Sequence, residues 1–220
     1  LITPAAYGAL ADSGYRRSFE FLLSLYRDKL APPVSNTEVA NLYQEFARGT
    51  FAMYITGPWN IGEFRRRLPA ELQDKWSTAP MPGPSGPGVS LAGGSSLVIL
   101  KSSPHKARAW ALMRYLSRPE VQVKFYQLTG DLPARQESWN DPVLANDREA
   151  RAFRDQLARA VPTPMVPEWE EVTTKVMDQT EVAVRGGVTP AAALAALDAE
   201  VNRLLERRRF LLARTARGSE

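Results

Sequence analysis

The chain has 220 residues, and its 44% hydrophobic content is enough to bury a core in one large domain or two small ones. It has 28 Lys and Arg against 24 Asp and Glu, a formal net charge of +4, no cysteine, and His105 as its one histidine. This composition excludes disulfides, thiolate catalysis and zinc sites built on sulfur, so we expect no metal and no cofactor.

The first third of the chain predicts two helices and a strand. Apolar residues recur three and four apart over Ser13–Leu30, which predicts an amphipathic helix ended by the prolines that follow. A second helix is predicted from about Thr37 to Arg48, with Gly49 suited to its left-handed end. Phe51–Thr56 then alternates apolar and polar residues, which predicts a strand.

Trp59 follows this strand at a tight turn. Gly57 and Pro58 break the strand, and the proline suits the first turn of a helix predicted over Ile61–Arg67. Ligands bind beyond strand ends in open α/β sheets, and an indole offers a flat apolar face to sugars, bases and aromatics. From the residues alone, ligand contact and core packing are equally good interpretations of Trp59.

The middle of the chain predicts a mixed α/β pattern. A short helix is predicted over Pro69–Lys75 and a short strand over Ser77–Pro80. The run MPGPSGPG, Met81–Gly88, should be a loop or linker, because its prolines and glycines cannot maintain helix or ladder hydrogen bonds. The apolar run Ser96–Leu100, preceded by Gly93 and Gly94, is typical of a buried parallel strand.

The remainder predicts helices separated by loops. Ser117 and Glu120 have the spacing of a capping box. The other predicted elements are a helix from Ser103 and Pro104, a helix to Leu128, loops at Gly130–Ala134 and Asn140–Asn146, a helix over Asp147–Ala160, an extended segment Pro162–Trp169, a helix over Glu168–Arg185, and a last helix capped by Thr189 and Pro190.

Four sequence runs follow one another in the chain: FARGTFAMYITGPW, GGSSLVIL, KSSPHKARAWALMRYLSRPEVQVKFYQLTGDLPA and PTPMVPEW. In this order they resemble the C-terminal half of the family 1 extracellular solute-binding proteins, which are the sugar-binding subunits of ABC importers. The similarity covers nearly the whole chain. It implies an α/β fold of the periplasmic-binding-protein-like type II class, with a helix-rich C-terminal lobe and an incomplete portion of the N-terminal lobe. In that family two hinged lobes close on the sugar.

The resemblance also implies a division of the chain between these lobes. Residues 1–88 and 142–220 would belong to the C-terminal lobe, and residues 89–141 to the N-terminal lobe, with hinge crossings between them. Family members are about twice as long, which exceeds the ordinary size of one domain. The chain begins at Leu1 rather than Met, and we expect it to be a fragment or a processed product that holds part of a cleft.

The same resemblance implies the ligand-binding residues. Trp59 would stack on a sugar ring, since the apolar C–H face of a pyranose matches an indole while polar groups take the hydroxyl rim. Gly93, Gly94 and Ser95 would bring backbone near the ligand, although a plain turn at the start of a strand explains them equally well. The further candidates are Trp169 as a second aromatic, Arg135 as a donor to hydroxyls, and Asn60.

The implied partners are a sugar ligand and the permease subunits of an ABC importer. The implied location is extracytoplasmic, either periplasmic or lipid-anchored at the outer face of the cytoplasmic membrane. No apolar stretch approaches the roughly 20 residues that span a bilayer, so we expect no integral membrane segment in this chain. No targeting signal is visible in LITPAAYGAL, and a removed signal stays open.

Two other functions remain as alternatives to a non-catalytic sugar binder. A glycoside hydrolase would use Glu168 and Glu171, but these are neighbours on one side of a helix and cannot easily flank a substrate. A basic nucleic-acid-binding module would use the arginines of the last helix, yet acidic residues are interleaved with them. We therefore expect no nucleic-acid partner.

Overall fold

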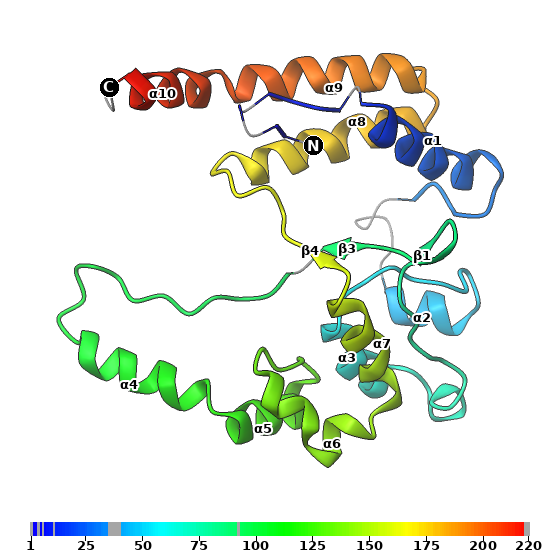
Figure 1. Cartoon of the computed structure of the whole chain (residues 1–220). Coiled ribbons are helices and arrows are strands. Elements are labelled where there is room, and N and C mark those ends of the chain that lie inside the picture. Colours follow the sequence, from blue (N-terminus) through cyan, green and yellow to red (C-terminus); the bar gives the residue numbers. More distant parts are fainter. Residues whose placement is uncertain are drawn as a thin grey trace. The chain divides into compact units, whose positions relative to one another are not determined.

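The computed structural model describes residues 2–3, 5, 7–10, 12–34, 41–91 and 93–217, with the backbone alone for residues 215–217 (Figure 1). The chain forms two compact units. Unit 1 comprises Leu1–Val39 and Thr163–Glu220, and unit 2 comprises Ala40–Pro162. The lobe boundaries near residues 88 and 141 stay a prediction.

Unit 1 is a helical unit. Its helices are α1 (Ser13–Arg27), α8 (Trp169–Val184), α9 (Pro190–Leu204) and α10 (Glu206–Arg217). Side-chain oxygens cap two of them, because Asp12 accepts from the Gly14 amide and Thr189 accepts from the Ala192 amide. The fully buried core residues are Leu10, Val172, Leu197, Val201 and Leu205. Burying a side chain of this size stabilises the fold by roughly 1.5–3 kcal/mol, so the α8–α9 contact dominates this unit.

Hydrogen bonds from backbone amides to side chains of α9 hold the N-terminal segment of unit 1 on that helix. The amide of Gly8 donates to Asn202 Oδ1 at 3.0 Å, and the amide of Leu10 donates to Asp198 Oδ1 at 3.1 Å. Asn202 Nδ2 donates to Asp198 Oδ2 at 3.0 Å, which fixes both acceptors. Leu10 is thereby delivered into the core as a fully buried residue.

Unit 2 contains short helices and very short strands. Its helices are α2 (Leu42–Ala47), α3 (Trp59–Arg67), η1 (Ala70–Leu72), α4 (Lys106–Leu116), α5 (Pro119–Thr129), η2 (Gln136–Asn140), α6 (Pro142–Ala145) and α7 (Arg148–Leu157). Its strands are β1 (Pro82–Gly83) antiparallel to β2 (Gly86–Pro87), and β3 (Ser90–Leu91) parallel to β4 (Ala160–Val161).

Two apolar clusters form the core of unit 2. One comprises Ile61, Phe64, Leu68 and Trp76. The other comprises Val123, Tyr126, Trp139, Leu144 and Ala150. The rings of Phe46 and Phe64 are 5.0 Å apart in an edge-on arrangement, a favourable geometry for aromatic pairs.

Two glycines let α3 and the end of α5 meet backbone to backbone. Gly130 ends α5 in the left-handed region at φ 85°, and a β-carbon on it would lie 2.7 Å from the amide nitrogen of Gly62. A β-carbon on Gly62 would overlap the carbonyl of Thr129. Neither position has room for a side chain, so these residues set the distance between the two helices.

A polar network connects α3, α5 and α7. The Asp147 side chain caps α7 by accepting from the amides of Glu149 at 3.0 Å and Ala150 at 3.1 Å. It also accepts from Arg65 Nη2 at 2.9 Å and from the Tyr126 hydroxyl. Arg65 Nη2 lies 3.0 Å from Glu149 as well, so one guanidinium joins two carboxylates.

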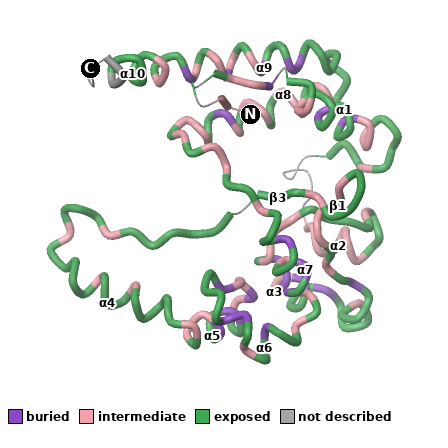
Figure 2. The backbone as a smooth tube through the Cα atoms, in the orientation of Figure 1, coloured by how far each residue is buried: buried purple, intermediate pink, exposed green. Residues whose placement is uncertain are grey.

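The strands predicted over Phe51–Thr56, Ser77–Pro80 and Ser96–Leu100 are wrong, because none of these ranges forms a strand. Within the described residues none of them has a paired neighbour, and an extended segment without one cannot form a ladder. In the last range Leu97, Val98 and Leu100 are 55%, 78% and 70% exposed instead of buried. Figure 2 shows the wider surroundings of this segment, up to α4, as mostly exposed.

Other local predictions are also corrected. The predicted loop at residues 81–88 contains the β1–β2 pair, because its glycines permit a tight two-stranded turn. The capping box is not formed: the Ser117 hydroxyl donates to the Met113 carbonyl, and Arg118 precedes α5 without a capping side chain. The predicted Asn140–Asn146 loop contains α6. The predicted start of the second helix, residues 37–40, lies outside the described residues.

Candidate ligand-binding site

Trp59 is the first residue of α3, and 56% of its surface is exposed. A helix start, rather than the predicted strand end, presents the indole. The segment before it is also exposed and apolar, with Met53 at 87% and Ile55 at 75%. Core packing of Trp59, one of the two interpretations of the sequence, is therefore excluded in this structure.

The position of the Trp59 ring depends on Gly57. A β-carbon on Gly57 would overlap the six-membered ring of the indole. The ring thus lies against bare backbone, which restricts its orientation without burying it. Gly57 also accepts a hydrogen bond from the Asn60 amide at 3.2 Å, which closes the turn that precedes α3.

Asn60 has a structural role in this turn, and its expected contact with the ligand stays a prediction. It is 7% exposed, its Oδ1 accepts from the Tyr43 hydroxyl at 2.7 Å, and its Nδ2 donates to Thr56 Oγ1 at 2.5 Å. Burial raises the pKa of Tyr43, which keeps that hydroxyl a donor. The side chain of Asn60 therefore stabilises the turn that carries Trp59, from the interior of unit 2.

Tyr43 and Thr56 are supporting residues that the sequence reasoning missed. Tyr43 packs edge-on against Phe64 at 5.5 Å, and the Arg67 guanidinium lies 5.1 Å from its ring centroid. The only signal in the sequence was the proximity of Thr56 to Asn60, four residues apart. Tyr43 comes from α2, and its contact with Asn60 depends on the tertiary fold.

The glycine segment lies in an exposed stretch between β3 and α4. Gly93, Gly94 and Ser95 are exposed, and β-carbons on the two glycines would meet nothing within 4 Å. Gly94 has φ 155°, which favours glycine. The contribution of this segment to a ligand site stays a prediction.

Trp169 is the first residue of α8 and belongs to unit 1. It is partly buried and packs against the core cluster around Leu10 and Val172. Its neighbour Glu168 accepts from Arg208 Nε at 2.7 Å, and this hydrogen bond lowers the pKa of Glu168. At least part of the Trp169 ring therefore serves the fold of unit 1.

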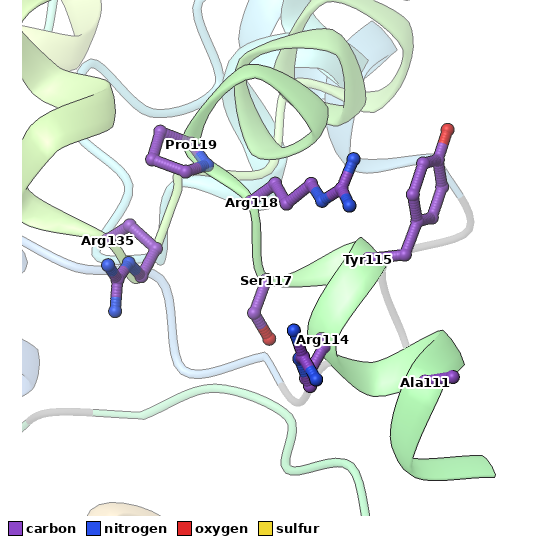
Figure 3. A pocket seen from close by; sticks show the side chains of 7 residues that line it. All are labelled: Ala111, Arg114, Tyr115, Ser117, Arg118, Pro119 and Arg135. Atoms are coloured by element: carbon purple, nitrogen blue, oxygen red, sulfur yellow. The ribbon is translucent and has the colours of Figure 1, made fainter. Parts of the chain in front are cut away.

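Arg135 lines a pocket between α4 and α5 that contains none of the other predicted site residues (Figure 3). Its backbone amide donates to Gln122 Oε1 at 3.0 Å, and its guanidinium donates to Glu137 at 3.2 Å. The pocket also contains Arg114 and Arg118, which the sequence reasoning did not single out. Their four-residue spacing across a helix boundary was the available signal.

Two properties of the described residues bear on the kind of site. They contain no group of three or more His, Asp or Glu side chains placed to hold a metal ion. Of the helices that they form, none has both the length and the apolar character required to cross a bilayer.

A family model for bacterial extracellular solute-binding proteins matches residues 5–152. The structure is similar to that of the sugar-binding protein MalE from the phytopathogen Xanthomonas citri, with a TM-score of 0.91 and 45% identity over 97% of this chain and 54% of that chain. It is also similar to the GacH receptor of Streptomyces glaucescens, solved unliganded and with acarbose, with a TM-score of 0.77 and 25% identity over 89% of this chain and 50% of that one.

A relative of known sequence is the galactooligosaccharide-binding protein of Bacillus subtilis (strain 168). It is 25% identical over 185 residues, which are 83% of this chain and 43% of that protein. The chain spans about half the length of the relatives that it matches.

Proposed function

The chain belongs to the bacterial extracellular solute-binding protein family, and from this membership we propose that the complete gene product binds an oligosaccharide or disaccharide for an ABC importer, without catalysis. Its fold is periplasmic-binding-protein-like and rich in helix. The sugar is enclosed between two hinged lobes and stacks on an indole.

The observation that carries this proposal is the exposed indole of Trp59 on a rigid base. Trp59 is 56% exposed, while the neighbouring Asn60 is 7% exposed and hydrogen-bonded to Tyr43 and Thr56. A fixed aromatic plane costs little conformational entropy on binding, so it suits a sugar ring whose apolar face needs cover.

The names of similar proteins support a carbohydrate as the ligand. They include a galactooligosaccharide-binding protein, a maltodextrin-binding protein and a sugar-binding protein MalE. Of these, the MalE structure is 45% identical to this chain. We therefore favour a glucose- or galactose-containing oligosaccharide.

The remaining site residues have secondary roles in this proposal. Gly93, Gly94 and Ser95 offer backbone groups to the ligand, and the exposed part of Trp169 is a second aromatic contact. Arg135 donates to hydroxyls at the edge. Residues 1–88 and 142–220 form the C-terminal lobe, and residues 89–141 belong to the N-terminal lobe.

The proposed setting is outside the cytoplasm, since the family is described as extracellular. There the loaded protein delivers its sugar to the permease subunits of an ABC importer. The protein is either periplasmic or held at the outer face of the cytoplasmic membrane by a lipid anchor.

A glycoside hydrolase using Glu168 and Glu171 has less support. A general acid needs a raised pKa, whereas the hydrogen bond from Arg208 lowers that of Glu168. The basic tail is likewise engaged within the chain, because Arg209 donates to the Asn202 carbonyl at 2.8 Å and lies over the ring of Tyr7. Glu168 therefore lacks the raised pKa of a general acid, and Arg209 is already bonded within the chain, so these contacts support neither alternative.

Calorimetric titration of the complete gene product with maltose, maltotriose and a galactooligosaccharide tests the proposal. Saturable binding of one of these sugars, with no release of reducing sugar on incubation, is the expected result. Absence of heat with every mono- and disaccharide in a wider screen would refute it.

A further inference from the structure

A pocket of about 520 Å³ lies where α4 ends and α5 begins (Figure 3). Its lining, called here the arginine pocket, comprises Ala111, Arg114, Tyr115, Ser117, Arg118, Pro119 and Arg135. The three arginines come from the last turn of α4, the junction between the helices and the residue before η2. Three positively charged side chains therefore line one hollow from separate points of the backbone.

The positive charge of the arginine pocket is poorly neutralised. In the part of the chain that the structure describes, Arg114 and Arg118 have no carboxylate partner. Arg135 pairs with Glu137 at 3.2 Å, but both side chains are more than half exposed, and such pairs contribute little. Like charges around one hollow repel, and an anion within it would relieve that repulsion.

The position of Arg118 also favours an anion in the arginine pocket. Arg118 precedes the first turn of α5, where the helix dipole favours negative charge, and no side chain caps that end. The Ser117 hydroxyl already donates to the Met113 carbonyl at 2.7 Å, whereas the guanidinium N–H groups of Arg114 and Arg118 and the Tyr115 hydroxyl can donate to a ligand. Arg118 lies over the ring of Tyr115, with 5.6 Å between its Cζ and the ring centroid, which holds the guanidinium near the pocket.

We propose that the arginine pocket binds a phosphate group, chiefly through Arg114 and Arg118, which are outside the proposed carbohydrate site. A guanidinium donates two parallel N–H bonds, a geometry that matches a tetrahedral oxyanion, and several phosphate oxygens can accept from different arginines at once. Ala111, Pro119 and the Tyr115 ring provide apolar walls for the organic part of a phosphate ester. The phosphate belongs either to a soluble ester or to a phospholipid headgroup.

The test is titration of the complete gene product with inorganic phosphate, followed by 31P NMR and calorimetry against potassium chloride of equal ionic strength. The double variant Arg114→Gln/Arg118→Gln should weaken phosphate binding at least about tenfold. Arg108→Gln is the matched control, because Arg108 is exposed on α4 and does not line the pocket. The control variant should bind phosphate like the wild type.

Vesicle co-sedimentation separates the two sources of phosphate. Binding to phosphatidylglycerol vesicles that is lost in the double variant, and is absent with neutral vesicles, assigns the pocket to a lipid headgroup. Binding of free phosphate without vesicle binding assigns it to a soluble ester. Failure of the wild type to bind either probe, or equal binding by the double variant, overturns the proposal. Sugar affinity should be unchanged in the double variant, because neither Arg114 nor Arg118 is a proposed sugar contact, so this result can be distinguished from failure of the carbohydrate site.

Discussion

The six-membered ring of Trp59 lies directly against the backbone of Gly57, at the position where any side chain would have its β-carbon. Glycine at this position allows the indole to rest on the turn while 56% of the residue stays exposed. The orientation of the proposed sugar platform therefore depends on a residue that has no side chain to contact the ligand.

Replacing the indole of Trp59 should abolish most of the sugar binding. Trp59→Ala in the complete gene product should lower sugar affinity by about 10²-fold or more, since aromatic anchors contribute several kcal/mol at binding sites. Trp110→Ala is the matched control, because Trp110 is equally exposed at 56% and is outside the predicted site. Calorimetry and tryptophan fluorescence both report the change, and unchanged affinity in Trp59→Ala would remove this residue from the site.

Gly57→Ala should act through the indole. The added methyl group displaces the ring, so we expect an affinity loss of about tenfold with little change in folding. A double-mutant cycle with Trp59→Ala gives the decisive comparison. If Gly57→Ala weakens binding equally in the Trp59→Ala background, the glycine acts by another route.

The hydrogen bonds of Asn60 beside Trp59 should contribute measurably to the free energy of unfolding. Asn60→Ala leaves the Tyr43 and Thr56 hydroxyls without their partner, and a buried unsatisfied polar group costs about 1–3 kcal/mol. Tyr43→Phe keeps the ring and leaves only Asn60 Oδ1 without its donor, so it should cost less than Asn60→Ala, at the lower end of this range, about 1 kcal/mol. Urea unfolding followed by circular dichroism checks both values, and the reverse order would contradict the proposed role of Asn60.

The network around Asp147 predicts a pH dependence. Burial alone raises the pKa of Asp147, but hydrogen bonds from Tyr126 and Arg65 outweigh burial, and the pKa lies below its usual value. A carboxyl whose pKa is lower in the folded state stabilises the fold above its unfolded pKa of about 3.9 and loses that contribution as the pH falls further. Asp147→Asn should therefore be less stable than the wild type at pH 7 by about 1–3 kcal/mol.

The stability difference between Asp147→Asn and the wild type should narrow below about pH 4. Denaturant unfolding at several pH values measures it. A difference that is constant from pH 7 to pH 3 would show that the charge of Asp147 contributes nothing through this network.

The helices with local signals were predictable from the sequence. The predicted helix over Glu168–Arg185 is confirmed as α8, and Thr189 and Pro190 begin α9 as expected, because a cap and a helix-compatible proline act within a few residues. The predicted resemblance to extracellular solute-binding proteins is confirmed by the family match. The strand predicted at Ser96–Leu100 was wrong, because a strand depends on a neighbour that may come from anywhere along a chain, and the described residues provide none.

The site was predictable only where it depends on one residue. The exposure of Trp59 agrees with the turn chemistry of Gly57 and Pro58. The burial of Asn60 depends on Tyr43, seventeen residues earlier in another helix, and no sequence period indicates that contact. The arginine pocket likewise requires Arg135 to return beside α4 and α5.

The contact between Gly62 and Gly130 has a mechanical consequence. Backbone touches backbone there, without a deformable side chain in between, so α3 cannot slide along the end of α5. Trp59, the first residue of α3, is therefore carried by a helix whose distance from the end of α5 is fixed by direct backbone contact.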